Sequence, residues 1–182
     1  MILSDTTIAE YLDQKKIVIL PEFNRENIRP VGVRLHLGSR LLIPRQGLTV
    51  DPEHSDQVLF DKIDISEEGH LLKPDDFVLG STYESFQVPR DMVCHIDGRS
   101  TVARLGLAIH CTSGMIDGNY EHPRTVVLEI KNQGNFTLIL RQGLAIAMLA
   151  FMPLSSDIAQ GIQSQYKHQY GVLPPNLTAQ KR

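Results

Sequence analysis

The sequence predicts an all-β protein, mainly β with short helices, and two observations support this class. Between about residues 21 and 153, short runs rich in β-branched residues alternate with turn segments rich in Gly, Pro, Asn and Asp. The chain has 182 residues and is 42% hydrophobic, which suits one globular domain. Many short strands at this spacing are typical of a β-barrel or a jelly-roll-like sandwich. The runs expected to form strands are 33–37, 40–43, 57–63, 77–81, 85–88, 92–96, 126–130, 137–140 and 145–151.

The two ends of the chain differ from this β texture. Ser4 and Asp5 are good helix N-caps, and apolar residues follow at helical spacing, which predicts a helix over 5–14. A strand over 17–20 then stops at Pro21. Residues 154–182 are polar and poorly periodic, so we expect a tail whose order depends on a ligand or a neighbour.

Composition excludes several classes of function. Lys and Arg number 18 against 21 Asp and Glu, a formal charge of -3, which argues against a nucleic-acid partner. Two cysteines are too few for a disulfide framework, and we expect reduced thiols in a cytoplasmic protein. The longest apolar runs are too short for a membrane span, and the N-terminus lacks the features of an export signal. The sequence therefore predicts a cytoplasmic protein without a membrane partner.

One short segment interrupts the strands and carries polar chemistry. Residues 97–107 read Asp-Gly-Arg-Ser-Thr-Val-Ala-Arg-Leu-Gly-Leu, which predicts a single short helix opened by hydroxyls. Two hydroxyls and two guanidiniums at a helix N-terminus would suit a phosphate group. The alternative is a surface helix whose arginines pair with neighbouring carboxylates.

A second candidate is an acidic residue inside an apolar strand. In the run 126–130, Glu129 shares a face with Val127, opposite Val126 and Leu128. It is either on a solvated face or a carboxylate with a catalytic role.

The sequence gives little support for a metal site or for a known cofactor-binding motif. The pairs Cys94-His95 and His110-Cys111 lack zinc-ligand spacing, and neighbouring strand residues point to opposite faces. The signature of zinc-dependent base deaminases, the Walker loop and the dinucleotide fingerprint are all missing from the sequence.

The run 97–107, followed by His110 to Asp117 and by Val127-Leu128-Glu129, resembles the dCTP deaminase branch of the trimeric dUTPase superfamily. The resemblance covers nearly the whole chain. It implies a distorted β-barrel or jelly roll that spans 1–182 as one domain, with 158–182 as a mobile C-terminal lid. It also implies a homotrimer with sites between subunits. The implied activity is hydrolytic deamination of dCTP to dUTP and ammonia, which supplies dUMP for thymidylate synthesis.

The resemblance also implies a role for each matching residue. Glu129 would be the general acid and base, and Arg104 would position the base and the water. Mg²⁺ would bind through the triphosphate, without zinc and without a metal site on the protein. Whether dTTP inhibits stays open. The implied substrate-binding residues are Arg99, Ser100, Thr101, Val102, Ala103, Asp117, Val127, Leu128, Tyr166 and Gln169.

Several positions depart from the family pattern. Arg34 falls where relatives carry an Asp, and Gln165 replaces a Lys in the tail. The loop between Asp117 and Glu129 is two residues longer, and it brings in Arg124. Gly114 stands where deaminase-only relatives have a His. Two alternatives therefore stay open: a bifunctional deaminase and dUTP diphosphatase that gives dUMP and pyrophosphate, and a non-catalytic nucleotide-binding trimer.

Overall fold

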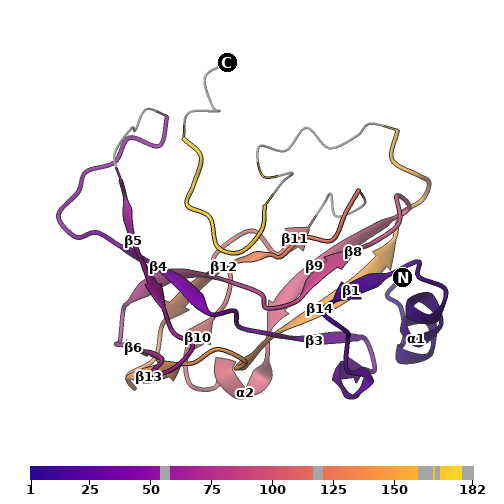
Figure 1. Cartoon of the computed structure of the whole chain (residues 1–182), viewed down its shortest axis with the longest axis horizontal. Helices are drawn as coiled ribbons and strands as arrows, with labels where there is room; N and C mark the ends of the chain where they lie inside the picture. Colours follow the sequence, from indigo (N-terminus) through magenta and orange to yellow (C-terminus); the bar gives the residue numbers. More distant parts are fainter. Residues whose placement is uncertain (54–57, 117–120, 160–165, 167–168, 178–182) are drawn as a thin grey trace.

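The computed structural model describes residues 1–53, 58–116, 121–159, 166 and 169–177. These residues form two five-stranded antiparallel sheets, two two-stranded sheets and short helices (Figure 1). The predicted fold class is therefore confirmed. Among these residues no helix is long and apolar enough to cross a membrane.

The N-terminal segment begins with helix α1 (Asp5–Asp13), close to the predicted helix. The helix ends one residue earlier than expected, because Lys15 adopts a positive φ of 56° and turns the chain away. Strand β1 (Val18–Leu20) follows and pairs with β8 (Ser85–Gln87). A 3-10 turn, η1 (Arg25–Asn27), then leads into the second large sheet.

The first large sheet runs in the order β10-β12-β7-β4-β5. At its centre, β12 pairs with β7, so that Glu129 lies opposite Leu79. These five strands are β10 (Leu107–Ala108), β12 (Val127–Asn132), β7 (Phe77–Ser81), β4 (Arg40–Pro44) and β5 (Phe60–Asp64).

The second large sheet runs in the order β11-β9-β14-β3-β2. Its long strand β14 pairs with β9 on one side and β3 on the other. These strands are β11 (Met115–Ile116), β9 (Met92–Gly98), β14 (Ala145–Pro153), β3 (Gly32–His36) and β2 (Ile28–Arg29). A separate two-stranded sheet pairs β13 (Leu138–Leu140) with β6 (His70–Leu72).

The core contains residues from both large sheets. Leu35, Leu41, Leu128 and Leu149 are fully buried in one cluster. The alternation of strand side chains explains this, because every second residue of β12 and β3 faces inward. Each predicted strand overlaps an observed one. The strands β2, β6, β10 and β11 were not predicted, because a segment of two or three residues is too short to display a period-two alternation.

Helix α2 (Ser100–Ala103) lies between β9 and β10, inside the predicted segment 97–107. The N-cap position belongs to Arg99, and its side chain does not cap the helix, so the hydroxyls of Ser100 and Thr101 lie in the first turn instead. Gly106 ends the turn with a φ of 87°, and a Cβ there would meet the backbone nitrogen of Gly134 at 2.3 Å. A glycine is therefore required for the chain to pass from α2 into β10.

Candidate active site

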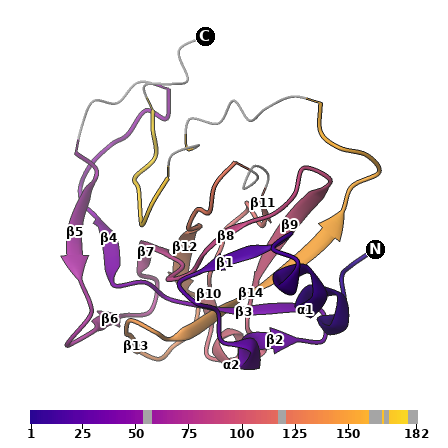
Figure 2. The ribbon, with the colours of Figure 1, turned by 45° about the vertical axis from the view of Figure 1, so that its right-hand side comes forward.

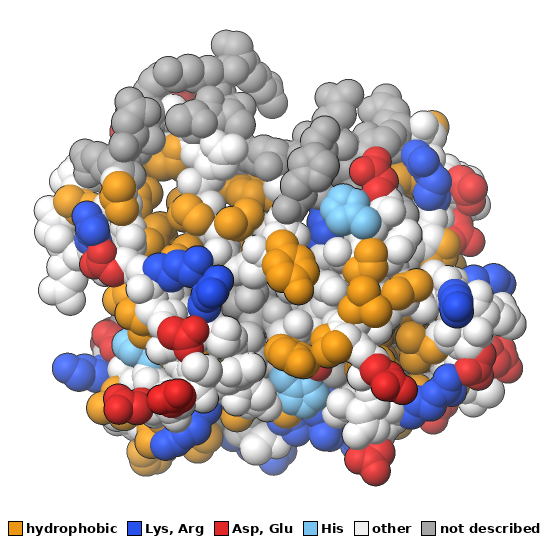
Figure 3. All heavy atoms as spheres, in the orientation of Figure 1, with side chains coloured by type: hydrophobic (Ala, Val, Ile, Leu, Met, Phe, Trp, Pro, Cys, Tyr) orange, Lys and Arg blue, Asp and Glu red, His pale blue; other side chains and the backbone are white. Residues whose placement is uncertain are grey.

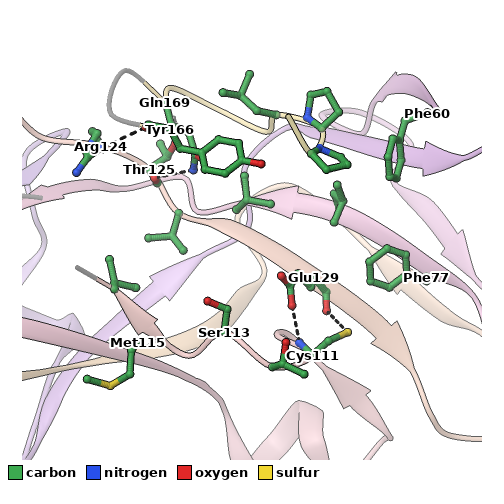
Figure 4. Close-up of a pocket in the computed structure, with 18 residues that line it drawn as sticks. Phe60, Phe77, Cys111, Ser113, Met115, Arg124, Thr125, Glu129, Tyr166 and Gln169 are labelled. Atoms are coloured by element: carbon green, nitrogen blue, oxygen red, sulfur yellow. Dashed lines mark hydrogen bonds between the residues drawn. The ribbon is translucent and has the colours of Figure 1, made fainter. Parts of the chain in front are cut away.

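A pocket of about 560 Å³ lies between β12, the 111–116 segment and the last described residues of the tail (Figure 4). Its walls are mostly apolar, with a carboxylate at one side. The residues that line it are Phe60, Phe77, Leu79, Cys111, Thr112, Ser113, Met115, Ile116, Arg124, Thr125, Val126, Val127, Glu129, Tyr166, Gln169, Leu173, Pro174 and Pro175.

Glu129 is oriented by its place on β12. Its side chain is half-buried, whereas its neighbours Leu128 and Ile130 are fully buried in the core. One carboxylate oxygen accepts a hydrogen bond of 2.8 Å from the backbone N–H of Cys111. The backbone N–H of Glu129 itself donates to the carbonyl of Ile109 at 3.0 Å. The carboxylate is thus held at the pocket wall, where it can exchange protons with a bound molecule.

The thiol of Cys111 lies beside this carboxylate. Cys111 places its Sγ 3.8 Å from the carbonyl oxygen of Glu129. Burial, and then the negative charge of Glu129, raise the pKa of Cys111 above its ordinary value. The nucleophilic form of a cysteine is the thiolate, and this shift makes the thiolate of Cys111 less accessible than that of an ordinary cysteine.

The sheet beside Glu129 offers apolar surface. Leu79 on β7 pairs with Glu129 across the strands, and Phe77 of β7 and Phe60 of β5 continue the same wall of the pocket (Figure 4). Hydrophobic side chains also gather across the middle of the face drawn in Figure 3. An apolar wall that carries a carboxylate at its edge suits a flat polar ring, whose faces are apolar and whose edge carries the polar groups.

The described part of the tail lines the pocket of its own chain. The amide of Gln169 donates to the carbonyl of Thr125 at 3.1 Å, and the backbone N–H of Gly171 donates to the Thr125 hydroxyl at 2.9 Å. Arg124 donates to the carbonyl of Tyr166 at 3.2 Å. Val172 is only 6% exposed and packs with Leu42 and Leu79. The tail is thus attached by both hydrogen bonds and apolar burial.

The segment 99–104 lies elsewhere. In Figures 1 and 2, α2 lies at the lower edge of the molecule, away from the tail at the top. None of Arg99, Ser100, Thr101, Val102, Ala103 and Arg104 lines the pocket. Val102 is buried in the core, while Ser100, Thr101, Ala103 and Arg104 are exposed.

The sequence-predicted residues therefore fall into two groups. Glu129, Val127, Tyr166 and Gln169 line one pocket. Leu128 belongs to the same strand, with its side chain in the core, and Asp117 lies outside the described residues. Sequence reasoning missed Phe60, Phe77, Cys111 and Thr125 as pocket residues, because nothing local in the sequence indicates which distant strands meet there.

The two Cys-His pairs lie in different environments. Cys94 is buried in the core, and burial raises the pKa of its thiol, whereas Cys111 lines the pocket. His95 and His110 meet edge to face, with ring centroids 6.4 Å apart. Within the described residues no group of three or more His, Cys, Asp or Glu is arranged to hold a metal ion.

Comparison with known proteins identifies the family. Residues 2–154 match the family model described as dCTP deaminase-like. The chain is 35% identical to the dCTP deaminase of Buchnera aphidicola subsp. Acyrthosiphon pisum over 97% of this chain and 98% of that protein. It is 37% identical to the dUMP-forming dCTP deaminase of Dictyoglomus thermophilum over 86% of this chain and 82% of that protein.

A solved structure shares the fold. The 2'-deoxycytidine 5'-triphosphate deaminase from Agrobacterium tumefaciens superposes with a TM-score of 0.64 at 22% identity, over 82% of this chain and 47% of that chain. This chain thus spans about half the length of that protein, and the likeness concerns the fold. The family model and the relatives cover far more than half of the sequence, and the chain belongs to the dCTP deaminase-like family.

Proposed function

We propose that this protein catalyses the hydrolytic deamination of dCTP to dUTP and ammonia. The observation that carries the proposal is a carboxylate, Glu129, fixed by the Cys111 N–H at the edge of a pocket with apolar walls. The family membership supports it, because relatives over nearly the whole chain are dCTP deaminases.

In the proposed mechanism Glu129 is the group that accepts and donates each transferred proton. Water attacks C4 of the cytosine ring while Glu129 takes a proton from that water and passes it to N3 of the ring. The carboxylate then takes the remaining hydroxyl proton and delivers it to the amino group, so that C4 becomes a carbonyl, the carbon–nitrogen bond breaks, and ammonia leaves. The hydrogen bond from the Cys111 N–H occupies one carboxylate oxygen of Glu129, and the other oxygen can accept from the attacking water.

The remaining predicted residues require a neighbouring subunit. We propose a homotrimer in which Arg104 of one subunit positions the base and the water beside Glu129 of the next. Arg99, Ser100 and Thr101 would hold the triphosphate, with Val102 and Ala103 in the same turn. The separation of α2 from the pocket supports this arrangement, and a heterologous contact repeated around a three-fold axis closes such a ring. Val127, Leu128, Tyr166, Gln169 and Asp117 would surround the nucleoside.

The proposed chemistry needs no zinc, and Mg²⁺ would arrive as part of the nucleotide. The ion would neutralise phosphate charge, whereas the side chains around Arg99 are cationic and do not suit a protein-bound metal. We also propose that residues 1–182 form one domain, with 158–182 closing over the nucleotide as a mobile lid, and that dTTP inhibits.

A second candidate is favoured by one position. Gly114 is buried, and a Cβ there would lie 2.9 Å from Nε2 of His95 and 3.2 Å from the carbonyl oxygen of Ile96. A larger residue therefore does not fit without movement, and the glycine matches the bifunctional relatives. Some relatives are dUMP-forming deaminases, which would make dUMP and pyrophosphate the products.

One experiment separates these candidates. The protein is incubated with dCTP and with dUTP separately, and the products are resolved by ion-exchange chromatography. We expect dUTP and ammonia from dCTP, and unchanged dUTP in the second reaction. Formation of dUMP and pyrophosphate in either reaction would favour the bifunctional enzyme, and unchanged dCTP would leave the non-catalytic trimer. Activity that is lost on zinc chelation and restored by zinc would contradict the zinc-free mechanism.

A further inference from the structure

Three arginines share one face of the sheet β11-β9-β14-β3-β2. Arg29 on β2 lies opposite Gly32, two residues before Arg34 on β3, so both side chains leave the same face. Met148 of β14 lies opposite Arg34 on one side and opposite Asp97 of β9 on the other. Arg99 follows Asp97 by two residues in extended backbone, which gives its side chain the same direction.

These guanidiniums have few partners of their own. Within the described residues none of the three forms an ion pair, and the buried Nε of Arg34 has no hydrogen-bond partner. Arg99 donates one bond of 2.6 Å to the carbonyl of Ala145. The acid in the same row, Asp97, accepts from the Gly98 N–H and lies 3.4 Å from His110.

The three charges also affect one another. Burial, followed by the positive charges of Arg34 and Arg29, lowers the pKa of Arg99. Like charges held this close oppose folding, and a bound anion would relieve the repulsion. Guanidiniums present several N–H donors in a plane and match phosphate oxygens well.

We propose that Arg34 and Arg29 extend the phosphate site of Arg99, so that one subunit contacts the substrate's polyphosphate directly through three guanidiniums. This inference rests on the proposed function only for the identity of the substrate. The ligand class is a linear polyphosphate, either free or as the triphosphate of a nucleotide. Because the contact is direct, it does not require a divalent cation.

The test measures binding of tripolyphosphate and of deoxycytidine by titration calorimetry, in EDTA. The variants are Arg34→Gln, the charge-conserving Arg34→Lys, Arg29→Gln and the control Arg40→Ala, which removes an exposed guanidinium on β4. A charge-assisted hydrogen bond predicts that Arg34→Gln weakens tripolyphosphate binding by about 10-fold or more. Arg34→Lys should retain most of the affinity, and the exposed Arg29→Gln should show a smaller loss. Arg40→Ala and all deoxycytidine affinities should stay at the wild-type value.

Three results would overturn the proposal. They are wild-type tripolyphosphate affinity in both Arg34→Gln and Arg29→Gln, equal losses for tripolyphosphate and deoxycytidine, and wild-type binding that disappears in EDTA. Arg29 is exposed, so Arg29→Gln keeps the test valid even where Arg34→Gln does not fold. A protein that binds tripolyphosphate through Arg34 but leaves dCTP unchanged would contradict the proposed function and support the anion site.

Discussion

The pocket around Glu129 and the segment around α2 are built in opposite ways. Glu129 is held by a backbone N–H, flanked by aromatic side chains of the same sheet, and shares its pocket with the tail of its own chain. Most side chains of α2 extend into solvent, and only Val102 anchors the helix in the core. The first region is a pocket lined by residues of one chain, whereas the second exposes hydroxyls and a guanidinium to solvent. Under the proposed function these regions are the two halves of one site, and they lie apart within a single chain.

This difference has an energetic reason. Exposed hydroxyls and guanidiniums are hydrated by water. The side chains of α2 can therefore stay without a protein partner at no cost in folding free energy. A half-buried carboxylate needs a donor to replace lost hydration, and Cys111 supplies it. Variants in each half test this comparison.

The largest expected effect comes from Glu129→Gln. Loss of a general acid and base typically lowers turnover by about 10²- to 10⁴-fold, while the amide oxygen can still accept from Cys111. Turnover of dCTP is measured by ammonia release, with thermal melting to check the fold and the exposed Glu67→Gln as control. A Glu129→Gln protein that keeps more than half of the wild-type turnover would remove the carboxylate from the mechanism.

Truncation after Ser156 tests the tail that covers the first half. Loss of closure should lower kcat/KM for dCTP on the order of 10²-fold, because the substrate is no longer positioned. The lost burial of Val172 should cost about 1.5–3 kcal/mol of unfolding free energy, which a typical domain tolerates. Limited proteolysis near residue 165 with and without dCTP complements the kinetics. Full activity of the truncated chain, with cleavage unchanged by nucleotide, would show that the tail is not a lid.

The second half is tested by Arg99→Ala. A charge-assisted hydrogen bond is worth roughly 1.5–3 kcal/mol, so affinity for dCTP should fall about 10- to 150-fold. Affinity for deoxycytidine, which lacks phosphates, should change little, and calorimetry with both ligands measures the difference. Equal losses for the two ligands would mean that Arg99 does not serve the phosphates.

Mixing two inactive variants tests whether the two regions form one site across a subunit interface. Glu129→Gln and Arg104→Ala are each expected to be inactive, but mixed trimers refolded at equal ratio should recover about a quarter of the wild-type activity. The recovery arises where an intact Glu129 meets an intact Arg104 from the neighbouring subunit. Light scattering on the mixture should give a trimer mass. An active monomer, or a refolded mixture as inactive as its components, would place both groups within one chain.

Much of this architecture is readable from the sequence alone. The period-two alternation in 126–130 predicted that Glu129 would share a face with Val127 and that Leu128 would face the core, and both are confirmed. Turn residues bounded the longer strands because Gly, Pro, Asn and Asp favour tight turns locally. The motif in 97–107 indicated the family, which the comparisons confirm.

Other features depend on contacts between residues far apart in the chain. No local pattern pairs the Cys111 N–H with Glu129, attaches Gln169 and Gly171 to Thr125, or buries Val172 beside Leu79. The alignment of Arg29, Arg34 and Arg99 follows from the order of strands in a sheet, and that order is set by the packing of the whole core. Sequence periodicity therefore determined which face each side chain occupies. Only the tertiary structure decided which faces meet, because strand pairing and burial are satisfied jointly by the entire chain.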